Sequence, residues 1–191
     1  MSEYIYVKKG KTYTNKTVET FTYVEVLNGG SASELYISGG RLTVSKGGSA
    51  DYISAGKGNI LIEKGGHISE TVLSSGGGLN VYSGGVASAV TLKKGGSMWI
   101  GHGGTVKGLD WTPGDGYFNP NQNFELTFAT RTPGVFLGSS GGLVSSWTQP
   151  VKDKAVLSGG SMYVMFGGSA NGIAVADYGS MYIFSGGTAT G

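Results

Sequence analysis

Carboxylates and basic side chains are the residues of this 191-residue chain that could perform general acid–base chemistry. Cleavage of a glycan needs two carboxylates, or a carboxylate with a Lys or Arg base, grouped on one face of the protein. Asp51 and Glu70 lie one repeat apart in the sequence and could approach each other, but neither has an evident partner base. A catalytic group would more readily arise in a less regular stretch that contains Asp110, Asp115, Glu125 and Arg131. We predict no catalytic residues and no enzymatic activity.

Nucleotide and metal sites are also weakly supported. Gly10-Lys11-Thr12 resembles the end of a phosphate-binding loop, but Ile5 stands where that loop requires glycine. His67 and His102 lie in different repeats without a Cys or acidic cluster, so we expect surface residues and not metal ligands. Calcium-binding glycine-rich repeats need Asp in each turn, whereas serine stands there in this chain. We predict no metal and no cofactor; the serines are Ser31, Ser49, Ser97, Ser161 and Ser169.

Three aromatic residues form the candidate binding site. Trp99, Tyr163 and Tyr182 each stand between two apolar residues that we expect to point inward, so their own side chains should point outward. Tyr82 and Phe184 fall at the next outward position. Outward aromatic rings can stack on sugar rings or on another protein. Alternatively, they form a ladder along the strand face, or lie under the irregular stretch.

Paired glycines recur at a nearly constant interval and define the elements that would position these side chains. A second glycine series falls between the members of the first. Self-similarity at a period of about 20 residues is typical of a solenoid, whose coils bury their apolar sides only by stacking. The first series is Gly29-Gly30, Gly47-Gly48, Gly65-Gly66, Gly84-Gly85 and Gly103-Gly104.

The residues between the glycines favour strands over helices. Apolar residues recur with period two, as in the pairs Leu42/Val44 and Met98/Ile100, which is typical of strands with one buried face. The other half of the coil has a second inward column, which reads Ala32, Leu35 and Ile37 in one coil. Each half-coil contains glycine, and a glycine inside a helix lowers the stability of that helix by roughly 1 kcal/mol. Helical solenoids are therefore excluded.

We predict an all-β fold, a parallel β-solenoid with coils of about 18–19 residues, and favour a right-handed β-helix because parallel crossovers prefer that hand. Glycine suits its corners, where φ is positive and stacked backbones lie about 4.8 Å apart. We interpret residues 1–191 as a single elongated domain. It would comprise a cap or first coils (1–27), regular coils (28–107), an irregular insertion (108–154) and regular coils (155–191).

The composition excludes several classes of protein. The chain has 37 Gly but only 4 Pro and no continuous Gly-X-Y repeat, so it is not collagen. With 39% apolar and 14% charged residues it is not a disordered tract. A net charge of +2 does not indicate a nucleic-acid partner. No apolar run is long enough to span a bilayer, so we expect no membrane insertion of this segment.

Two stretches, from Gly47 to Gly66 and from Gly167 to Gly187, resemble the repeats of AIDA-type autotransporter adhesin passengers, which have the general form GGxAxxxxV..GGxxxV. The likeness covers residues 28–107 and 155–191. It implies a passenger on the bacterial cell surface or secreted, although residues 1–9 contain no apolar segment of a signal peptide. It also implies adhesion or self-aggregation, with a host or bacterial surface glycan or protein, or another copy, as partner. Some relatives are glycosylated on Ser or Thr by a heptosyltransferase.

The predicted function is therefore that of a non-enzymatic, surface-displayed adhesin or self-associating passenger. The alternative is a glycan-binding or glycan-cleaving β-helix protein of the tailspike-like or polysaccharide lyase-like kind. Exposed aromatics with repetitive Ser and Thr would favour the adhesin. Two carboxylates within about 10 Å of each other in a cleft would favour the enzyme.

Overall fold

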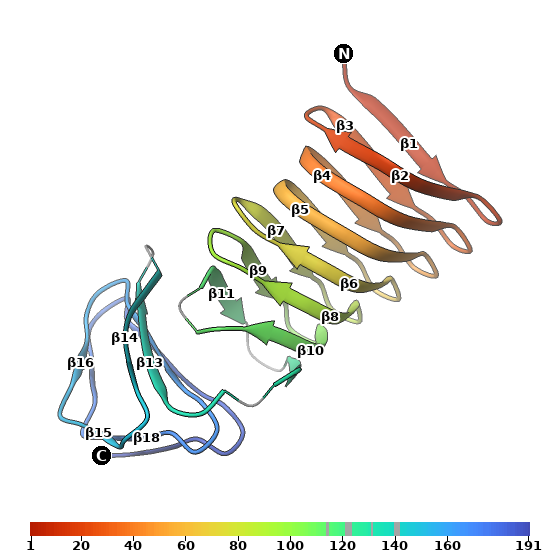
Figure 1. Cartoon of the computed structure of the whole chain (residues 1–191). Coiled ribbons are helices and arrows are strands. Elements are labelled where there is room, and N and C mark those ends of the chain that lie inside the picture. The colour runs from red at the N-terminus through yellow and green to blue at the C-terminus, as the bar shows by residue number, and fades with distance from the viewer. Residues whose placement is uncertain (114, 121–123, 131, 140–141) are drawn as a thin grey trace. The chain divides into compact units, whose positions relative to one another are not determined.

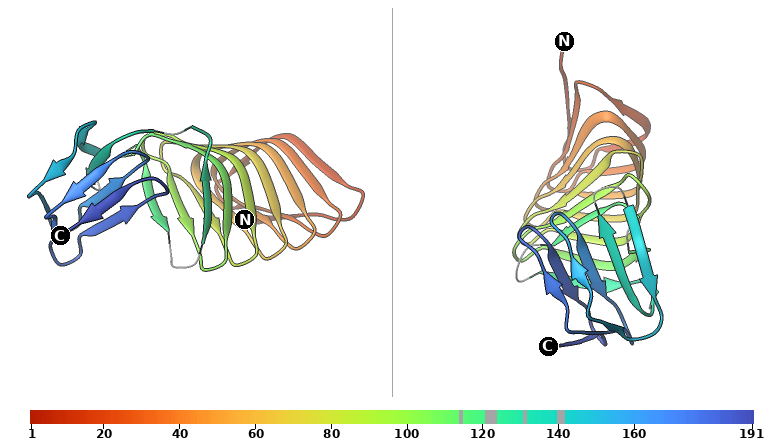
Figure 2. Two further views of the ribbon diagram at one scale, coloured as in Figure 1. Left: turned by 90° about the horizontal axis from the view of Figure 1, so that it is seen from below. Right: turned by 90° about the vertical axis from the view of Figure 1, so that its left-hand side faces the viewer.

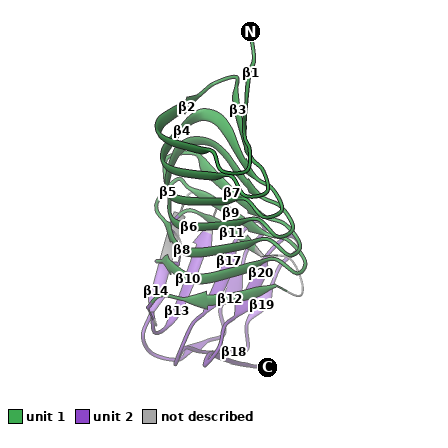
Figure 3. Cartoon of the chain, turned by 90° about the vertical axis from the view of Figure 1, so that its right-hand side faces the viewer, with its two compact units in different colours: residues 1–111, 116–129 green, residues 112–115, 130–191 purple. Residues whose placement is uncertain are grey.

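The computed structural model describes residues 1–113, 115–120, 124–130, 132–139 and 142–191, and these contain strands but no helix (Figure 1). In that part of the chain there is accordingly no helical segment long and apolar enough to cross a membrane. Successive coils pair through parallel strands, so the predicted parallel β-solenoid is confirmed. The chain forms two compact units, residues 1–111 with 116–129, and residues 112–115 with 130–191 (Figure 3). The prediction of a single domain stays a prediction.

The first unit is a stack of coils whose strands belong to one 12-stranded sheet, visible as successive parallel ribbons in Figure 2. Each coil pairs with the next in register; for example, Leu42 lies opposite Ile60, and Ile60 opposite Leu79. The strands are β1 (Glu3–Val7), β2 (Thr12–Glu19), β3 (Thr22–Val26), β4 (Ser31–Val44), β5 (Ser49–Ile62), β6 (His67–Leu73), β7 (Gly77–Val81), β8 (Val86–Leu92), β9 (Ser97–Ile100), β10 (Thr105–Trp111), β11 (Tyr117–Pro120) and β12 (Glu125–Phe128).

Each coil turns at three residues with positive φ, which gives it three short sides. In one coil these corners are Gly47 (75°), Tyr52 (55°) and Gly58 (82°). The glycine corners confirm the role predicted for the two glycine series. The middle corner was not predicted, because in most coils it carries a residue other than glycine. These residues have φ between 49° and 55° and stack in one column: Asn15, Glu34, Tyr52, Glu70 and Ala89.

The middle corner explains the uneven spacing of the second inward column. Ala32 and Leu35 are three residues apart and both are buried, whereas a straight strand alternates its faces every residue. Glu34, with φ of 52°, turns the chain between them, so that its own side chain is exposed and Leu35 returns to the interior.

Ala89→Gly is expected to stabilise the protein. Ala89 has φ of 49° and is exposed, and a left-handed conformation costs a residue with a Cβ roughly 1–2 kcal/mol. Glycine removes that cost, but it also raises the conformational entropy of the unfolded chain, which offsets part of the gain. The free energy of unfolding should therefore rise by about 0.5–1 kcal/mol. Gly108 already occupies the same column in the next coil. Urea unfolding measures the gain; the control Ser88→Gly, in the adjacent extended residue, should destabilise, and equal effects would contradict this interpretation.

The interior of the first unit is the column predicted from the period-two pattern. Leu42, Val44, Ile60 and Ile62 are fully buried, and Ala32, Leu35 and Ile37 line the other half of the coil. Thr71 is a buried polar residue in this column, and its hydroxyl donates to the backbone oxygen of Ser69 at 3.4 Å. The inward assignment is thereby confirmed for these coils.

The regular coils of the first unit extend further than predicted. Residues 105–128 were expected to lie largely in an irregular insertion, yet β10, β11 and β12 continue the parallel register of β8 and β9. Trp111 lies opposite Leu92, Phe118 lies opposite Met98, and both aromatic rings are buried with centroids 5.1 Å apart. This coil was missed because large rings replace the usual aliphatic residues, and because the single Gly116 stands before β11 where most coils have a Gly-Gly pair.

The second unit combines a hairpin with a shorter stack. Strands β13 (Val135–Ser139) and β14 (Gly142–Trp147) are antiparallel, and β13 also pairs antiparallel with β17, on the side of β17 opposite to β20. The other pairs are parallel, and their core includes Val151, Met162 and Val164. The remaining strands are β15 (Val151–Lys152), β16 (Ala155–Val156), β17 (Ser161–Val164), β18 (Ser169–Asn171), β19 (Ala174–Val175), β20 (Ser180–Ile183) and β21 (Thr188–Thr190).

Two apolar residues of the second unit that stand at inward positions of the repeat are exposed. Val175 is 44% and Ile183 51% exposed, although their partners in the preceding coil, Val156 and Val164, are fully buried. This coil contains β18, β19 and β20. On its side away from the preceding coil, β21 is the only described strand that pairs with it, and its partner there is β18. An inward side chain of a solenoid is buried only when a coil lies on each side of it. Val175 and Ile183 are covered on one side only, and this explains their exposure.

Candidate functional site

The structure does not pair the two carboxylates that are one repeat apart. The register partner of Asp51 is Ser69, whose hydroxyl donates to the Asp51 carboxylate. Glu70 is the next residue, stands at a left-handed corner and is exposed. Asp51 and Glu70, which the sequence suggested could approach each other, are therefore not register partners, because the repeat at this point is one residue shorter than their separation. Asp51 instead joins a ladder of hydroxyls in which Ser33 donates to Thr14 at 2.9 Å.

The acidic residues of the predicted irregular stretch belong to different units. Asp110 is exposed on β10, and Glu125 on β12 accepts a hydrogen bond from Thr105 at 3.2 Å. Asp115 belongs to the other unit, and Arg131 lies outside the described residues.

The weaker sequence motifs have structural roles. Gly10 is a corner with φ of 73°, and the residues after it form strand β2 and not the helix that a phosphate-binding loop requires. His67 begins β6 and is exposed, with Ser49 and Val86 as its register partners. His102 is exposed in a corner. Within the described ranges, no three His, Cys, Asp or Glu side chains come together as a possible metal site.

The three predicted binding aromatics differ in exposure. Trp99 is partly exposed on β9, and its ring meets that of Tyr82 edge to face, with centroids 5.3 Å apart. Tyr163 and Tyr182 stack in successive coils at 5.4 Å with an interplanar angle of 11°. Tyr163 is only 6% exposed and lies between Phe136 and Tyr182 in register, which agrees with the alternative of a ladder along the strand face and not with an exposed binding residue. The binding role of Trp99 and Tyr182 stays a prediction.

Sequence reasoning missed a groove on the outer side of the first unit. It lies over β3, β4, β5 and β7, which pair in that order, and has a volume of about 290 Å³. Its floor contains Thr43 and Leu61, which are direct register partners. The polar and aromatic residues around this floor are Glu25, Arg41, Glu63 and Tyr82.

Register explains how residues far apart in sequence reach this groove. Glu25, Thr43 and Leu61 occupy one outward column, one residue from each coil. Glu63 and Tyr82 follow the ends of β5 and β7, where their backbone N–H groups donate to the carbonyl oxygens of Val44 and Ile62. The groove therefore exists only because four coils are stacked.

Two carboxylates in the groove share one hydroxyl. Ser45 Oγ lies 2.9 Å from Glu25 Oε1 and 3.0 Å from Glu63 Oε2. A serine hydroxyl has one hydrogen, so it donates to only one of these carboxylates at a time. The other carboxylate oxygen keeps an acceptor site for a further donor. The two glutamates come from alternate coils, which is why neither the repeat nor their separation in the sequence indicated a pair.

Aromatic stacks lie at both ends of the groove. At one end, Tyr4 and Tyr23 stack at 4.9 Å, and the guanidinium of Arg41 lies 4.9 Å from the centre of the Tyr23 ring. At the other end are Tyr82 and Trp99. Such stacks hold planar side chains in fixed orientations and are worth about 0.5–1.5 kcal/mol each.

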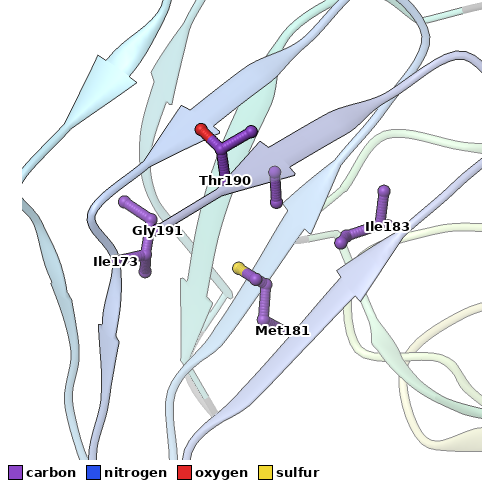
Figure 4. A pocket seen from close by; sticks show the side chains of 6 residues that line it. Ile173, Met181, Ile183, Thr190 and Gly191 are labelled. Carbon is purple, nitrogen blue, oxygen red and sulfur yellow. The ribbon is translucent and has the colours of Figure 1, made fainter.

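A second pocket, of about 240 Å³, lies in the second unit (Figure 4). Its lining includes Met181, Ile183 and Ala189, whose partners in the preceding coil, Met162, Val164 and Ala170, form the core. Figure 4 shows the labelled apolar side chains around a common space. This pocket is thus the interior column of the stack, partly open where one side is uncovered.

No protein-family model matches this chain, and no curated protein matches it. Among solved structures, it is similar to a TibA fragment, residues 55–350, crystallised in a TibC-catalysed, hyper-glycosylated form. The TM-score is 0.57 and the identity 21%, with 98% of this chain and 87% of that chain covered. The likeness concerns the fold.

Proposed function

We propose that this chain is a non-enzymatic binding segment of an adhesin passenger, displayed on a bacterial surface or secreted, and that it adheres through outward side chains of its coils. Its partner is a surface glycan, a surface protein or another copy of the chain. The observation that carries the proposal is the run of partly exposed aromatic and polar side chains along one side of the first unit, from Tyr4 and Tyr23 to Tyr82 and Trp99.

Two further facts support the proposal. The AIDA-type repeat pattern in the sequence and the similarity of the fold to a TibA fragment both agree with a passenger solenoid. The hydroxyl ladder of Thr14, Ser33 and Ser69 adds a polar, repetitive face beside the aromatic one. Flat, repetitive surfaces of this kind suit extended contact with a partner.

Replacing Trp99 and Tyr182 by serine is expected to weaken adhesion about tenfold, because exposed aromatic residues dominate binding energies at interfaces. The experiment coats fluorescent beads with the full chain and counts beads bound to cultured epithelial cells, to bacteria and to each other. Circular dichroism should show the same strand signal in the variant, since both side chains point away from the interior column.

The matched control replaces Tyr36 and Tyr178, which are 48% and 90% exposed but lie outside the aromatic stacks. Beads carrying Tyr36→Ser and Tyr178→Ser should adhere as the original chain does. Equal losses in the two double variants, or no loss in either, would contradict the assignment. Release of new reducing ends from a polysaccharide would instead favour the glycan-cleaving alternative.

A further inference from the structure

We propose that the groove over β3, β4, β5 and β7 binds a short neutral oligosaccharide. This inference rests on the proposed adhesive function and assigns one ligand class to one site of the first unit. The site is defined by Glu25, Arg41, Thr43, Leu61, Glu63 and Tyr82, which we call the groove residues.

The dimensions of the groove suit a linear ligand. It extends from Glu25 on β3 to Tyr82 after β7, which are three strand spacings apart. At about 4.8 Å per spacing this is about 14 Å, roughly the length of a trisaccharide. A groove of about 290 Å³ is at the small end of ligand sites, which agrees with a short segment of a glycan.

The residue types match the two faces of a sugar ring. The apolar face of a pyranose packs on aromatic and aliphatic surface, here Leu61 and the exposed Tyr82 ring. The ring of Tyr82 is held in place by its edge contact with Trp99, so less side-chain entropy is lost when a ligand binds.

The polar groups offer acceptors and donors for vicinal hydroxyls. Ser45 can donate to Glu25 or Glu63 but not to both at once, which leaves a carboxylate oxygen that a sugar hydroxyl can satisfy. Arg41 supplies several N–H donors, and its guanidinium is oriented by the ring of Tyr23. Both kinds of group can contact adjacent hydroxyls in a bidentate way.

The charge of the groove favours a neutral ligand over an anionic one. Two carboxylates and one guanidinium are among the groove residues, so a sulfated or sialylated glycan would meet a net negative site. Glu25 and Glu63, both within hydrogen-bond distance of Ser45 Oγ, are closer than the separation of about 10 Å that would favour a glycan-cleaving enzyme. The exposure of the site to solvent nevertheless fits binding without cleavage. Glu63 is exposed, and an acid that must protonate a leaving group normally lies in a pocket that removes it from water.

The test titrates the full chain with maltotriose, cellotriose and triacetylchitotriose, and with sialyllactose as an anionic probe, and follows backbone amide shifts by NMR. We expect saturable shifts at the groove residues with at least one neutral trisaccharide below about 20 mM. Tyr82→Ser and Glu63→Gln should each weaken that binding at least about fivefold. Tyr36→Ser, an equally exposed tyrosine outside the groove, should change it less than about twofold.

The outcomes separate this inference from the adhesive function. Absence of saturable shifts with all three neutral probes, tighter binding of sialyllactose, or an equal effect of Tyr36→Ser would overturn the groove assignment. If beads still adhere in that case, the adhesive proposal stands without the groove. If a trisaccharide binds at the groove but beads adhere to nothing, the groove stands and the adhesive proposal fails. Cleavage of the trisaccharide would overturn binding without catalysis.

Discussion

Ile100→Asp is expected to unfold the coils around β9 and to lower the free energy of unfolding by about 4 kcal/mol. Ile100 is fully buried in the interior column, in register with Val81 of the preceding coil. A carboxylate there would lose its hydration among aliphatic side chains and gain no partner. Urea unfolding followed by circular dichroism measures the loss.

Ser97→Asp is the matched control in the same strand. Ser97 points outward, and its neighbours in register are Gly78 and Tyr117, so the new carboxylate meets neither apolar interior nor an opposing acid. We expect a change of less than about 1 kcal/mol. Similar losses for Ile100→Asp and Ser97→Asp would show that the inward and outward faces of β9 are assigned wrongly.

Gly66→Ala is expected to cost about 3 kcal/mol, because a Cβ at Gly66 would overlap the backbone carbonyl oxygen of Val44 in the preceding coil. That oxygen accepts the N–H of Glu63 at 3.0 Å, so separating the two coils also strains a hydrogen bond of the stack. The loss is read from the midpoint and slope of urea unfolding.

Gly65→Ala tests the other member of the same pair. Gly65 has φ of 76°, but the nearest atom to its added Cβ is Lys46 Cγ at 3.1 Å, in a flexible side chain that can move. We expect only the cost of the left-handed conformation, about 1 kcal/mol. If Gly65→Ala were the more damaging of the two, corner conformation and not coil-to-coil approach would explain the second glycine of each pair.

The two candidate sites show how far sequence reasoning reached. Trp99 was selected because its neighbours Met98 and Ile100 had to point inward, and the structure places its ring on the outer side beside Tyr82. Tyr163 was selected by the same rule, yet it is buried in a ladder with Phe136 and Tyr182. Alternation gives the side of a strand, but it carries no information on what covers that side.

The sequence by itself determined the solenoid, its coil length and its interior columns. These are properties of each repeat, since a strand with one apolar face must bury it and a corner with close backbones admits only glycine. The middle corner was not determined in this way, because neighbouring coils hold residues such as Glu70 and Ala89 in a left-handed conformation that their types do not favour.

The tertiary structure alone decided the groove. Glu25, Ser45 and Glu63 come from three coils, and their hydrogen bonds depend on a register that brings residues of successive coils side by side. The same register put Ser69, and not Glu70, opposite Asp51. One residue of register moves a side chain to the other side of its strand, and that choice is made by the packing of the whole stack.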